Sequence, residues 1–347
     1  MKHLLNLSLI LLLALSSCGD APEKSNSTES SEELNVYTHR HYESDKVLFA
    51  EFEKETGIKV NVVNAKADEL MMKIEQEGEL SPADVLITVD AGRLVRAKNK
   101  GILQRVKSKI LNTNIPAKYR DEENNWFGLT KRARVFIYNP EVMKAEDFST
   151  YRDLADQKWK GTIAVRSSEN IYNQSLMAGI IANSHVDFAK AWAENVVKNM
   201  CRAPKGNDRD QIKAAYHGDA KVAIANTYYL GKMIGSSDEE EAKIGKAMKI
   251  FFPNTETTGT HVNISGAGVC KYAPNKDNAV KFLEFLSSKS AQETFSTANY
   301  EYPVNPEAST SMLLLSWGEM IEDPLNLAIL GELNKQAVQT FDAAGWK

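Results

Sequence analysis

The sequence predicts an α/β protein built of two lobes, each a sheet flanked by helices, with a hinged cleft between them. First, strand-like and helix-like segments alternate three times within residues 34–101, which is typical of a parallel sheet covered by helices. Second, about 310 residues follow a polar N-terminal stretch, and this is more than a single hydrophobic core usually supports. Third, the chain is expected to cross between lobes near 133 and again near 258–262, which makes a hinge.

Residues 34–101 contain the three predicted strand–helix pairs. Short apolar or alternating runs predict the strands, and apolar residues at helical spacing predict the helices. Gly57 is expected to end the first helix, Asp90 to cap the third and Gly101 to end it. The strands are expected at 34–37, 58–62 and 84–89, and the first two helices at 45–55 and 67–77.

The rest of the chain is predicted to continue the α/β pattern. Asp208 is expected to cap one helix, with Gln211 at the reciprocal capping position. The strands are expected at 134–138, 162–165, 221–225 and 261–269, and the other helices at 171–183, 188–200 and 278–298. We therefore assign residues 34–132 plus 258–302 to the first lobe and residues 133–257 plus 303–347 to the second.

The N-terminus has the features of a lipoprotein export signal. Lys2 precedes an apolar run of about a dozen residues, too short for a membrane-spanning helix, which needs roughly 20. The run ends in Leu15-Ser16-Ser17-Cys18, which resembles a bacterial lipobox. We expect residues 1–17 to be a signal peptide and Cys18 to carry the lipid that anchors the chain to a membrane. Residues 18–33 are polar and rich in Ser and Glu, and we expect a flexible tether.

Charge and cysteine content narrow the class of protein. The formal net charge is −4, and it becomes −5 without residues 1–17, whose only formal charge is on Lys2. Nucleic-acid binding requires a basic face, so a nucleic-acid partner is not expected. Cys201 and Cys270 form no Cys-x-x-Cys pair, which argues against a thiolate metal site. A disulfide between them would tie the lobes together and oppose hinge closure, so we expect both thiols to be free and buried.

Tyrosines occur where predicted strands end. Ligands in open α/β sheets lie outside the carboxyl ends of the strands, and the segments at those ends are 37–42, 166–174 and 226–232. Residues 126–134, between the lobes, are a fourth candidate segment. A tyrosine at a strand end often serves only packing, so its position alone does not identify a metal site.

Longer runs connect the sequence to a known family. They are Thr38-His39-Arg40-His41-Tyr42, 81–93, 171–175, 206–212, 225–231 and 259–269. Through these runs the chain, from about residue 34 to 305, resembles the cyanobacterial-type ferric-iron-binding proteins. These are a branch of the periplasmic binding protein superfamily with the type II, transferrin-like fold. The resemblance implies an extracytoplasmic solute-binding protein, not an enzyme, that carries Fe(III) as its transported ligand to the permease of an ABC importer.

The resemblance also implies the ligands of a metal site. In that family a His-Tyr pair, a Tyr in an Ile-Tyr-Asn-Gln run and a Tyr-Tyr pair bind iron, and they fall on His41, Tyr42, Tyr172, Tyr228 and Tyr229. Fe(III) is a hard cation that prefers anionic oxygen. Free tyrosine titrates at about 10, so the metal has to displace the phenol protons. His41 is either a direct ligand or a hydrogen-bond partner that orients Tyr42.

Such a site needs cations nearby. Four phenolates and a neutral imidazole would leave Fe(III) with a net charge of about −1. Arg132 and Lys232 are the candidates for offsetting it. The family often has Arg where Lys232 stands; Lys keeps the positive charge but lacks the rigid bidentate geometry of Arg.

Other functions remain open at this point. The same fold would also suit Fe(II) or a different small solute, and an exported enzyme could use His41 with Asp45, or His261, for acid–base chemistry. The sequence contains no HExxH, P-loop, dinucleotide-binding or nucleophile-elbow motif. We expect a monomer in the cell envelope, on its extracytoplasmic side.

Overall fold

The computed structural model describes residues 32–40 and 42–347. The predicted signal peptide, Cys18, most of the predicted tether and His41 lie outside these residues, so the expectations for them stay predictions. No helix among the described residues is long and apolar enough to cross a membrane.

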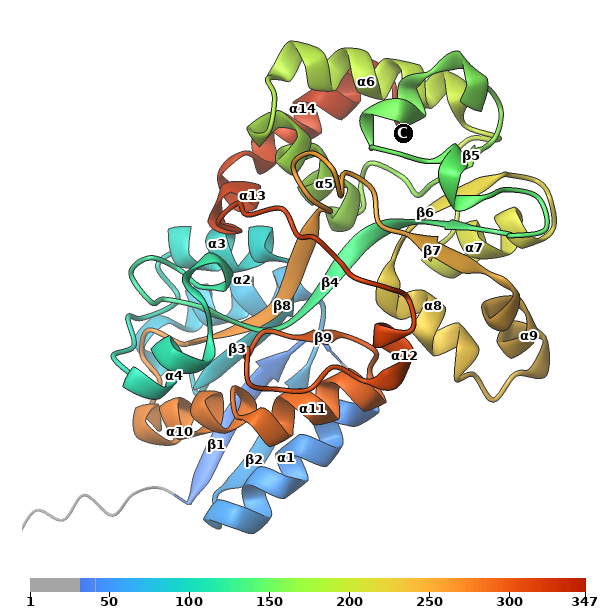
Figure 1. The fold of residues 1–347 in the computed structure, drawn as a ribbon. Helices are drawn as coiled ribbons and strands as arrows, with labels where there is room; N and C mark the ends of the chain where they lie inside the picture. The colour runs from blue at the N-terminus through green and yellow to red at the C-terminus, as the bar shows by residue number, and fades with distance from the viewer. Residues whose placement is uncertain (1–31, 41) are drawn as a thin grey trace, which may run out of the picture. The chain divides into compact units, whose positions relative to one another are not determined.

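Three parallel strands form the first part of the sheet (Figure 1). β1 (Glu33–Thr38) lies between β2 (Lys59–Asn64) and β3 (Val85–Val89) and is parallel to both. The helices that connect and follow them are α1 (Glu43–Thr56), α2 (Ala67–Glu77) and α3 (Ala91–Asn99). Gly57 ends α1 with a φ of 74°, a conformation that glycine adopts without strain. The parallel βα units predicted for residues 34–101 are therefore confirmed.

Two long antiparallel strands continue the sheet. β8 (Val262–Val269) pairs with β3, and β4 (Phe127–Tyr138) pairs with β8. The N-terminal half of β4 lies against β8, whereas its C-terminal half lies against β6 (Val222–Asn226). The strand order is β2-β1-β3-β8-β4-β6-β5, so the sheet is mixed rather than purely parallel. β4 is the strand that the two halves of the sheet share.

The start of β4 differs from the sequence prediction. The strand begins at Phe127, not at residue 134, and includes most of the segment expected to connect the lobes. Lys131, Arg132 and Arg134 interrupt the apolar pattern there, which hid the strand. Arg132 and Arg134 are nevertheless buried, because other side chains provide partners for them, as described below.

The second half of the fold contains short strands and the helices that accompany them. β5 (Ile163–Ala164) is parallel to β6, and β7 (Lys249–Phe251) is antiparallel to β4. The helices are α5 (Ile171–Ala182), α6 (Val186–Asn199), α7 (Asp208–Tyr216), α8 (Thr227–Ile234) and α9 (Glu239–Ala247). The helices predicted at 171–183 and 188–200 are confirmed, with ends that shift by one or two residues.

Two helix predictions are wrong. The single helix expected at 278–298 is two helices, α10 (Lys276–Leu286) and α11 (Lys289–Ala298). The chain breaks between them because the Ser288 hydroxyl accepts a hydrogen bond from the Ala291 N–H and so caps α11. The cap of α7 is Asn207 rather than Asp208, and its reciprocal partner is Asp210 rather than Gln211. Asp208 instead forms buried ion pairs.

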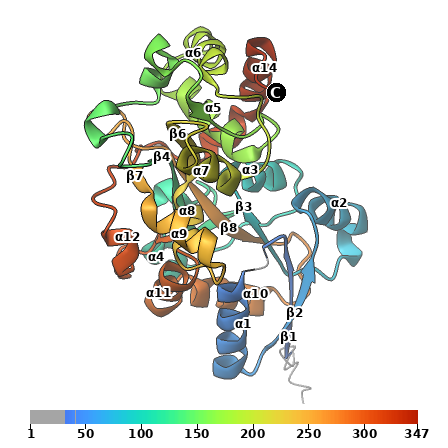
Figure 2. The same ribbon diagram turned by 90° about the vertical axis from the view of Figure 1, so that its right-hand side faces the viewer.

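The C-terminal region connects the two halves of the fold. Its elements are β9 (Tyr302–Pro303), α12 (Met312–Leu315), α13 (Ala328–Glu332) and α14 (Asn334–Ala344). The remaining short helix, α4 (Lys109–Asn114), precedes β4. α13 packs against both α3 and α5, and α14 packs against α5 and α6 (Figures 1 and 2). A Cβ on Gly331 would lie 2.4 Å from the Val95 Cβ, so only glycine allows α13 this close to α3.

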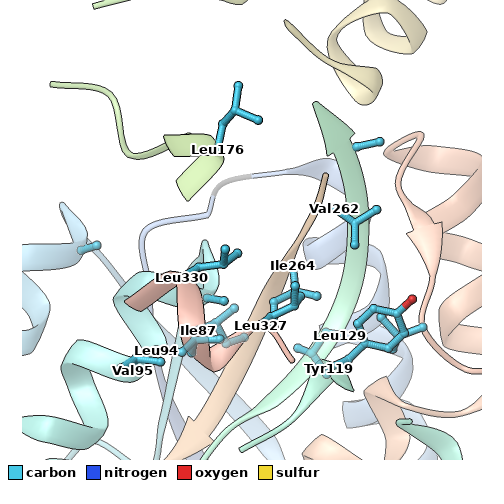
Figure 3. Close-up of a cluster of buried hydrophobic side chains, with 14 of the residues drawn as sticks. Ile87, Leu94, Val95, Tyr119, Leu129, Leu176, Val262, Ile264, Leu327 and Leu330 are labelled. Atoms are coloured by element: carbon cyan, nitrogen blue, oxygen red, sulfur yellow. The ribbon is translucent and has the colours of Figure 1, made fainter. Parts of the chain in front are cut away.

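One continuous hydrophobic core lies beneath these contacts. Figure 3 shows Leu327 and Leu330 among side chains of α3 and β8, including Leu94 and Ile264. These four residues are at most 2 % exposed. Burying a leucine or isoleucine side chain contributes about 1.5–3 kcal/mol, so this cluster holds the C-terminal region firmly to the sheet.

Both cysteines of the described residues are free thiols, as predicted. Cys270 follows β8 and is buried. Cys201 follows α6 and is only half-buried, so the expectation that both thiols are buried is wrong for Cys201.

Candidate functional site

A cavity of about 620 Å³ brings four of the predicted tyrosines together. Tyr42, Tyr172, Tyr228 and Tyr229 all line it. They belong to the starts of α1, α5 and α8, three segments far apart in the sequence. His41, the fifth predicted ligand, lies outside the described residues. Other polar side chains in the lining are His39, Arg40, Glu43, Asn207, Arg209, Lys232 and Asn299.

The Tyr228–Tyr229 pair reaches the cavity because β6 ends just before it. β6 ends at Asn226 and α8 begins at Thr227, so both tyrosines lie in the first turn of a helix. Adjacent residues point to opposite faces of a strand but are only about 100° apart around a helix. The two rings accordingly stack, with centroids 4.3 Å apart. The sequence prediction that the strand ends before this pair is confirmed.

Tyr172 approaches the same point from α5. Asn170 caps this helix by accepting a hydrogen bond from the Tyr172 N–H at 3.1 Å. The Tyr172 hydroxyl then lies 3.3 Å from the Tyr228 hydroxyl. Two phenol oxygens from different helices are therefore close enough to bind one ion.

Tyr42 faces these tyrosines from the start of α1. The Lys232 ammonium lies 3.6 Å from the centroid of its ring, and the Arg40 guanidinium lies 4.8 Å from it. Arg40 is fixed in turn by two hydrogen bonds to Asp45, at 3.0 and 2.8 Å, and by the Glu301 carboxylate at 3.6 Å. This buried ion cluster ties Arg40 to Asp45 in the first turn of α1, the helix that Tyr42 caps.

The Arg134 guanidinium holds together the elements that carry the other three tyrosines. Its Nη1 donates to Asp208 at 2.5 Å and to Asn226 at 3.2 Å, and its Nη2 donates to Asn173 at 2.7 Å. Asn173 follows Tyr172, and Asn226 is the N-cap of α8, two residues before Tyr228. Asp208 also accepts from Arg166 at 2.7 Å. One buried guanidinium thus fixes the starts of α5, α7 and α8 relative to β4.

The surroundings of the phenols favour their protonated state. Burial raises the pKa of Tyr42, Tyr228 and Tyr229, because each would carry a negative charge in a poorly solvated place. The other tyrosines add to this, since ionising one phenol makes it harder to ionise the next. Without a cation in the cavity, these phenols remain neutral well above neutral pH.

The two predicted cations occupy different places. Lys232 lines the cavity, and burial lowers its pKa to about 8, so the ammonium form predominates at neutral pH. Arg132 does not line the cavity: it lies 5.7 Å from the centroid of the Tyr172 ring and donates to the Ser265 hydroxyl at 3.3 Å. Of the two predicted cations, Lys232 is the one placed to act directly on an ion in the cavity.

Several residues of the site escaped the sequence analysis. Arg40 and Arg209 line the cavity, and Arg134 and Asp208 support it. The charged residues inside the apolar pattern of β4 were an available signal, because a buried arginine in a strand needs a partner. Asp208 was interpreted only as a helix cap, and its ion pairs depend on contacts that the sequence does not show.

Phenol oxygens are the most numerous metal-binding groups in this cavity, beside the Glu43 carboxylate and the His39 imidazole. Among residues 32–40 and 42–347, no group of three or more His, Cys, Asp or Glu side chains is placed to hold a metal ion. The donors are hard oxygens, and the nearby cations Arg40, Lys232 and Arg209 favour a negatively charged occupant or ligand set.

This fold and site are those of a solute-binding protein. The chain belongs to the bacterial extracellular solute-binding proteins, whose family profile matches residues 37–293. Proteins of this family bind solutes for transport and are not enzymes.

Matches to individual proteins are more informative than the family profile. The chain is 47% identical over 335 residues to iron uptake protein A1 of Synechocystis sp., across 96% of this chain and 93% of that protein. It is 42% identical over 316 residues to iron uptake protein A2 of the same organism, across 90% of each. Among solved structures, Trichodesmium IdiA (FutA) in complex with iron and citrate ligands matches with a TM-score of 0.88 and 47% identity. That match covers 91% of this chain and 100% of the other. The resemblance inferred from the sequence is confirmed.

Asp208→Asn tests whether the buried ion pairs support the site. We expect the substitution to lower the free energy of unfolding by about 3–5 kcal/mol, because it leaves the Arg134 guanidinium buried without its counter-charge. Glu75→Gln, which breaks an exposed ion pair with Lys100, is the matched control and should cost less than about 1 kcal/mol. Urea unfolding followed by circular dichroism measures both, and equal effects would contradict a supporting role for Asp208.

Proposed function

We propose that this protein captures ferric iron through tyrosine phenolates in the 620 Å³ cavity and delivers it to the permease of an ABC importer. The observation that carries the proposal is the convergence of Tyr42, Tyr172, Tyr228 and Tyr229 from three separate segments on one cavity. Packing alone would not require four phenols to share a polar cavity. His41 would supply a fifth ligand.

The chemistry of the cavity suits a highly charged cation. Buried phenols that are neutral without metal bind weak cations poorly, because the cation has to displace their protons. Fe(III) is hard and strongly charged enough to do so. Four phenolates and a neutral imidazole around Fe(III) leave about one negative charge, which Lys232, in contact with the Tyr42 ring, offsets.

The relatives support this assignment. Two are called iron uptake proteins, and the Neisseria meningitidis relative, 25% identical over 320 residues, is called a major ferric iron-binding protein. The solved Trichodesmium structure contains iron. Because this chain matches nearly the whole length of the Synechocystis proteins, the same cargo is the simplest conclusion.

Release requires the cavity to open, and we propose that it opens between two lobes. Residues 34–132 plus 258–302 form the first lobe and residues 133–257 plus 303–347 the second. Tyr42 then belongs to one lobe and Tyr172, Tyr228 and Tyr229 to the other. The Ser175 hydroxyl of α5 donates to the Asp90 carboxylate, whose oxygens lie 2.7 and 2.9 Å away, and the Asn263 amide of β8 donates to the same carboxylate at 2.9 Å. These contacts lie where a hinge would turn.

We also propose that Cys18 anchors the protein to a membrane through lipid. The apolar run, the small residues before Cys18 and the polar stretch after it support this. An anchored binding protein stays near its permease while the tether lets it reorient.

Paired substitution of Tyr228→Phe and Tyr229→Phe tests the metal site. Both rings keep their stacking, but two oxygens are lost. We expect iron affinity to fall more than about 100-fold, since side chains that bind the metal directly matter at least as much as those that only orient them. The colour from phenolate-to-iron charge transfer should disappear, and elemental analysis of the purified protein measures the iron.

Tyr138→Phe is the control for this pair, because Tyr138 is buried beside Phe148 outside the cavity. It should keep both iron and colour. Full retention of both by the paired variant would refute the iron site.

Reduction tests which oxidation state of iron the protein carries. Dithionite with a ferrous chelator should strip iron from the wild-type protein. Tighter binding of Fe(II) than of Fe(III) would identify ferrous iron as the cargo.

Iron affinity should fall as the pH is lowered. Tyr42, Tyr228 and Tyr229 have raised pKa values and hold their protons when free, so each of these phenols releases one proton when it binds iron. Each released proton should weaken the apparent affinity about tenfold for every unit of pH decrease. Charge-transfer absorbance against a chelator of known pH dependence measures this slope. A pH-independent affinity between pH 8 and pH 5 would show that phenolates are not the ligands.

The native N-terminal peptide tests the anchor. Mass spectrometry should find a mature chain that begins at Cys18 with lipid attached. Cys18→Ser should release the protein from the membrane fraction without changing its iron content. An unmodified native peptide that begins at another residue would refute the anchor.

A further inference from the structure

A second cavity, of about 330 Å³, lies at the opposite end of α5 from Tyr172. Its lining shares no residue with that of the tyrosine cavity. The lining comes from residues 150–152, the later turns of α5, the start of α6, the segment 254–261 and Asp323. The volume is within the range of about 300–1,000 Å³ that is typical of small-molecule sites.

An unpartnered imidazole faces this cavity. His261 is only 6% exposed, yet neither ring nitrogen has a hydrogen-bond partner among the described residues. Its backbone is fixed, because His261 N–H donates to the Tyr151 hydroxyl and the His261 carbonyl accepts from Arg134 N–H. A Cβ on Gly179 would lie 2.9 Å from its Nδ1, so the absence of a side chain there leaves room for the ring. The ring nitrogens therefore open onto the cavity, where a ligand can serve as their partner.

The charges around His261 favour a negative partner. Burial lowers its pKa to about 3, and the positive charges of Arg134 and Arg132 contribute, so the ring is neutral and keeps one N–H donor. Arg152 is exposed, lies 5.4 Å from the centroid of the Phe188 ring, and forms no ion pair among the described residues. A free guanidinium and an unused N–H donor therefore face one cavity.

The remaining walls favour a small apolar body with a single charge. Leu176, Ile180, Phe188 and Trp192 provide apolar surface, and the Trp192 indole N–H is already used by the Tyr151 carbonyl at 2.7 Å. The Asp323 carboxylate also lines the cavity, where it accepts from the Asn183 amide and from Leu325 N–H. A second negative charge on a ligand would be repelled by Asp323.

We propose that this cavity binds a small organic monocarboxylate with an aromatic or branched apolar body. The carboxylate accepts a hydrogen bond from His261 and is attracted by Arg152, while the body packs against Phe188 and Trp192. This binding does not depend on the proposed iron function, because it uses none of the tyrosines.

The probe is 4-fluorobenzoate, observed by ¹⁹F NMR on the iron-free full chain. We expect saturable binding at least about tenfold tighter than that of neutral 4-fluorobenzamide or dianionic 4-fluorophthalate. Arg152→Gln, at an exposed position, should weaken 4-fluorobenzoate about tenfold and leave 4-fluorobenzamide unchanged. Ile180→Trp should fill the cavity and abolish binding of all three.

His261→Phe keeps the ring shape and removes the donor. It should also weaken 4-fluorobenzoate about tenfold without lowering the urea midpoint, because no protein hydrogen bond is lost. Arg209→Gln, in the tyrosine cavity, is the control and should not affect binding.

Three results would overturn the proposal: no saturable binding, equal affinity for 4-fluorobenzoate and 4-fluorobenzamide, or wild-type binding in Arg152→Gln and Ile180→Trp. Loss of binding in Arg209→Gln would also overturn it, by placing the probe in the tyrosine cavity.

Discussion

The buried guanidinium of Arg134 is the interaction on which the site depends most. It lies in β4, the strand shared by the two halves of the sheet, and it contacts the starts of three helices through Asp208, Asn173 and Asn226. A buried charge is costly unless its partners are well placed, so this guanidinium tolerates few arrangements of its neighbours. The helix starts that carry Tyr172, Tyr228 and Tyr229 are positioned by that requirement rather than by hydrophobic packing alone.

Much of the fold could be predicted because local patterns agree with it. The alternation of strands and helices in residues 34–101 and the end of β6 before Tyr228 are properties of short segments, which the sequence displays directly. The beginning of β4 and the break at Ser288 were not predictable in this way. In β4, partners that are distant in the sequence allow charged side chains to be buried within a strand. At Ser288, continuous amphipathic spacing conceals a helix start that is set locally, by the Ser288 hydroxyl and the Ala291 N–H.

The candidate site was only partly visible in the sequence. The tyrosines were identified through a resemblance to a family, and the structure places four of them around one cavity. The supporting ions were not identified, because the pairing of Arg40 with Glu301, or of Arg134 with Asp208, joins residues 261 and 74 positions apart in the chain. Such pairs leave no periodic signal. The same burial raises the pKa of Tyr42, Tyr228 and Tyr229 and so favours their protonated form.

The position of β8 has a consequence for how the chain folds. β3 ends at Val89, but its neighbour in the sheet, β8, begins only at Val262. During synthesis, the edge of β3 therefore stays without its native partner until most of the chain has been made. Contacts of such long sequence separation close slowly, and an exposed strand edge invites pairing with other chains. The first half of the sheet is thus the part most in need of protection before the polypeptide is complete.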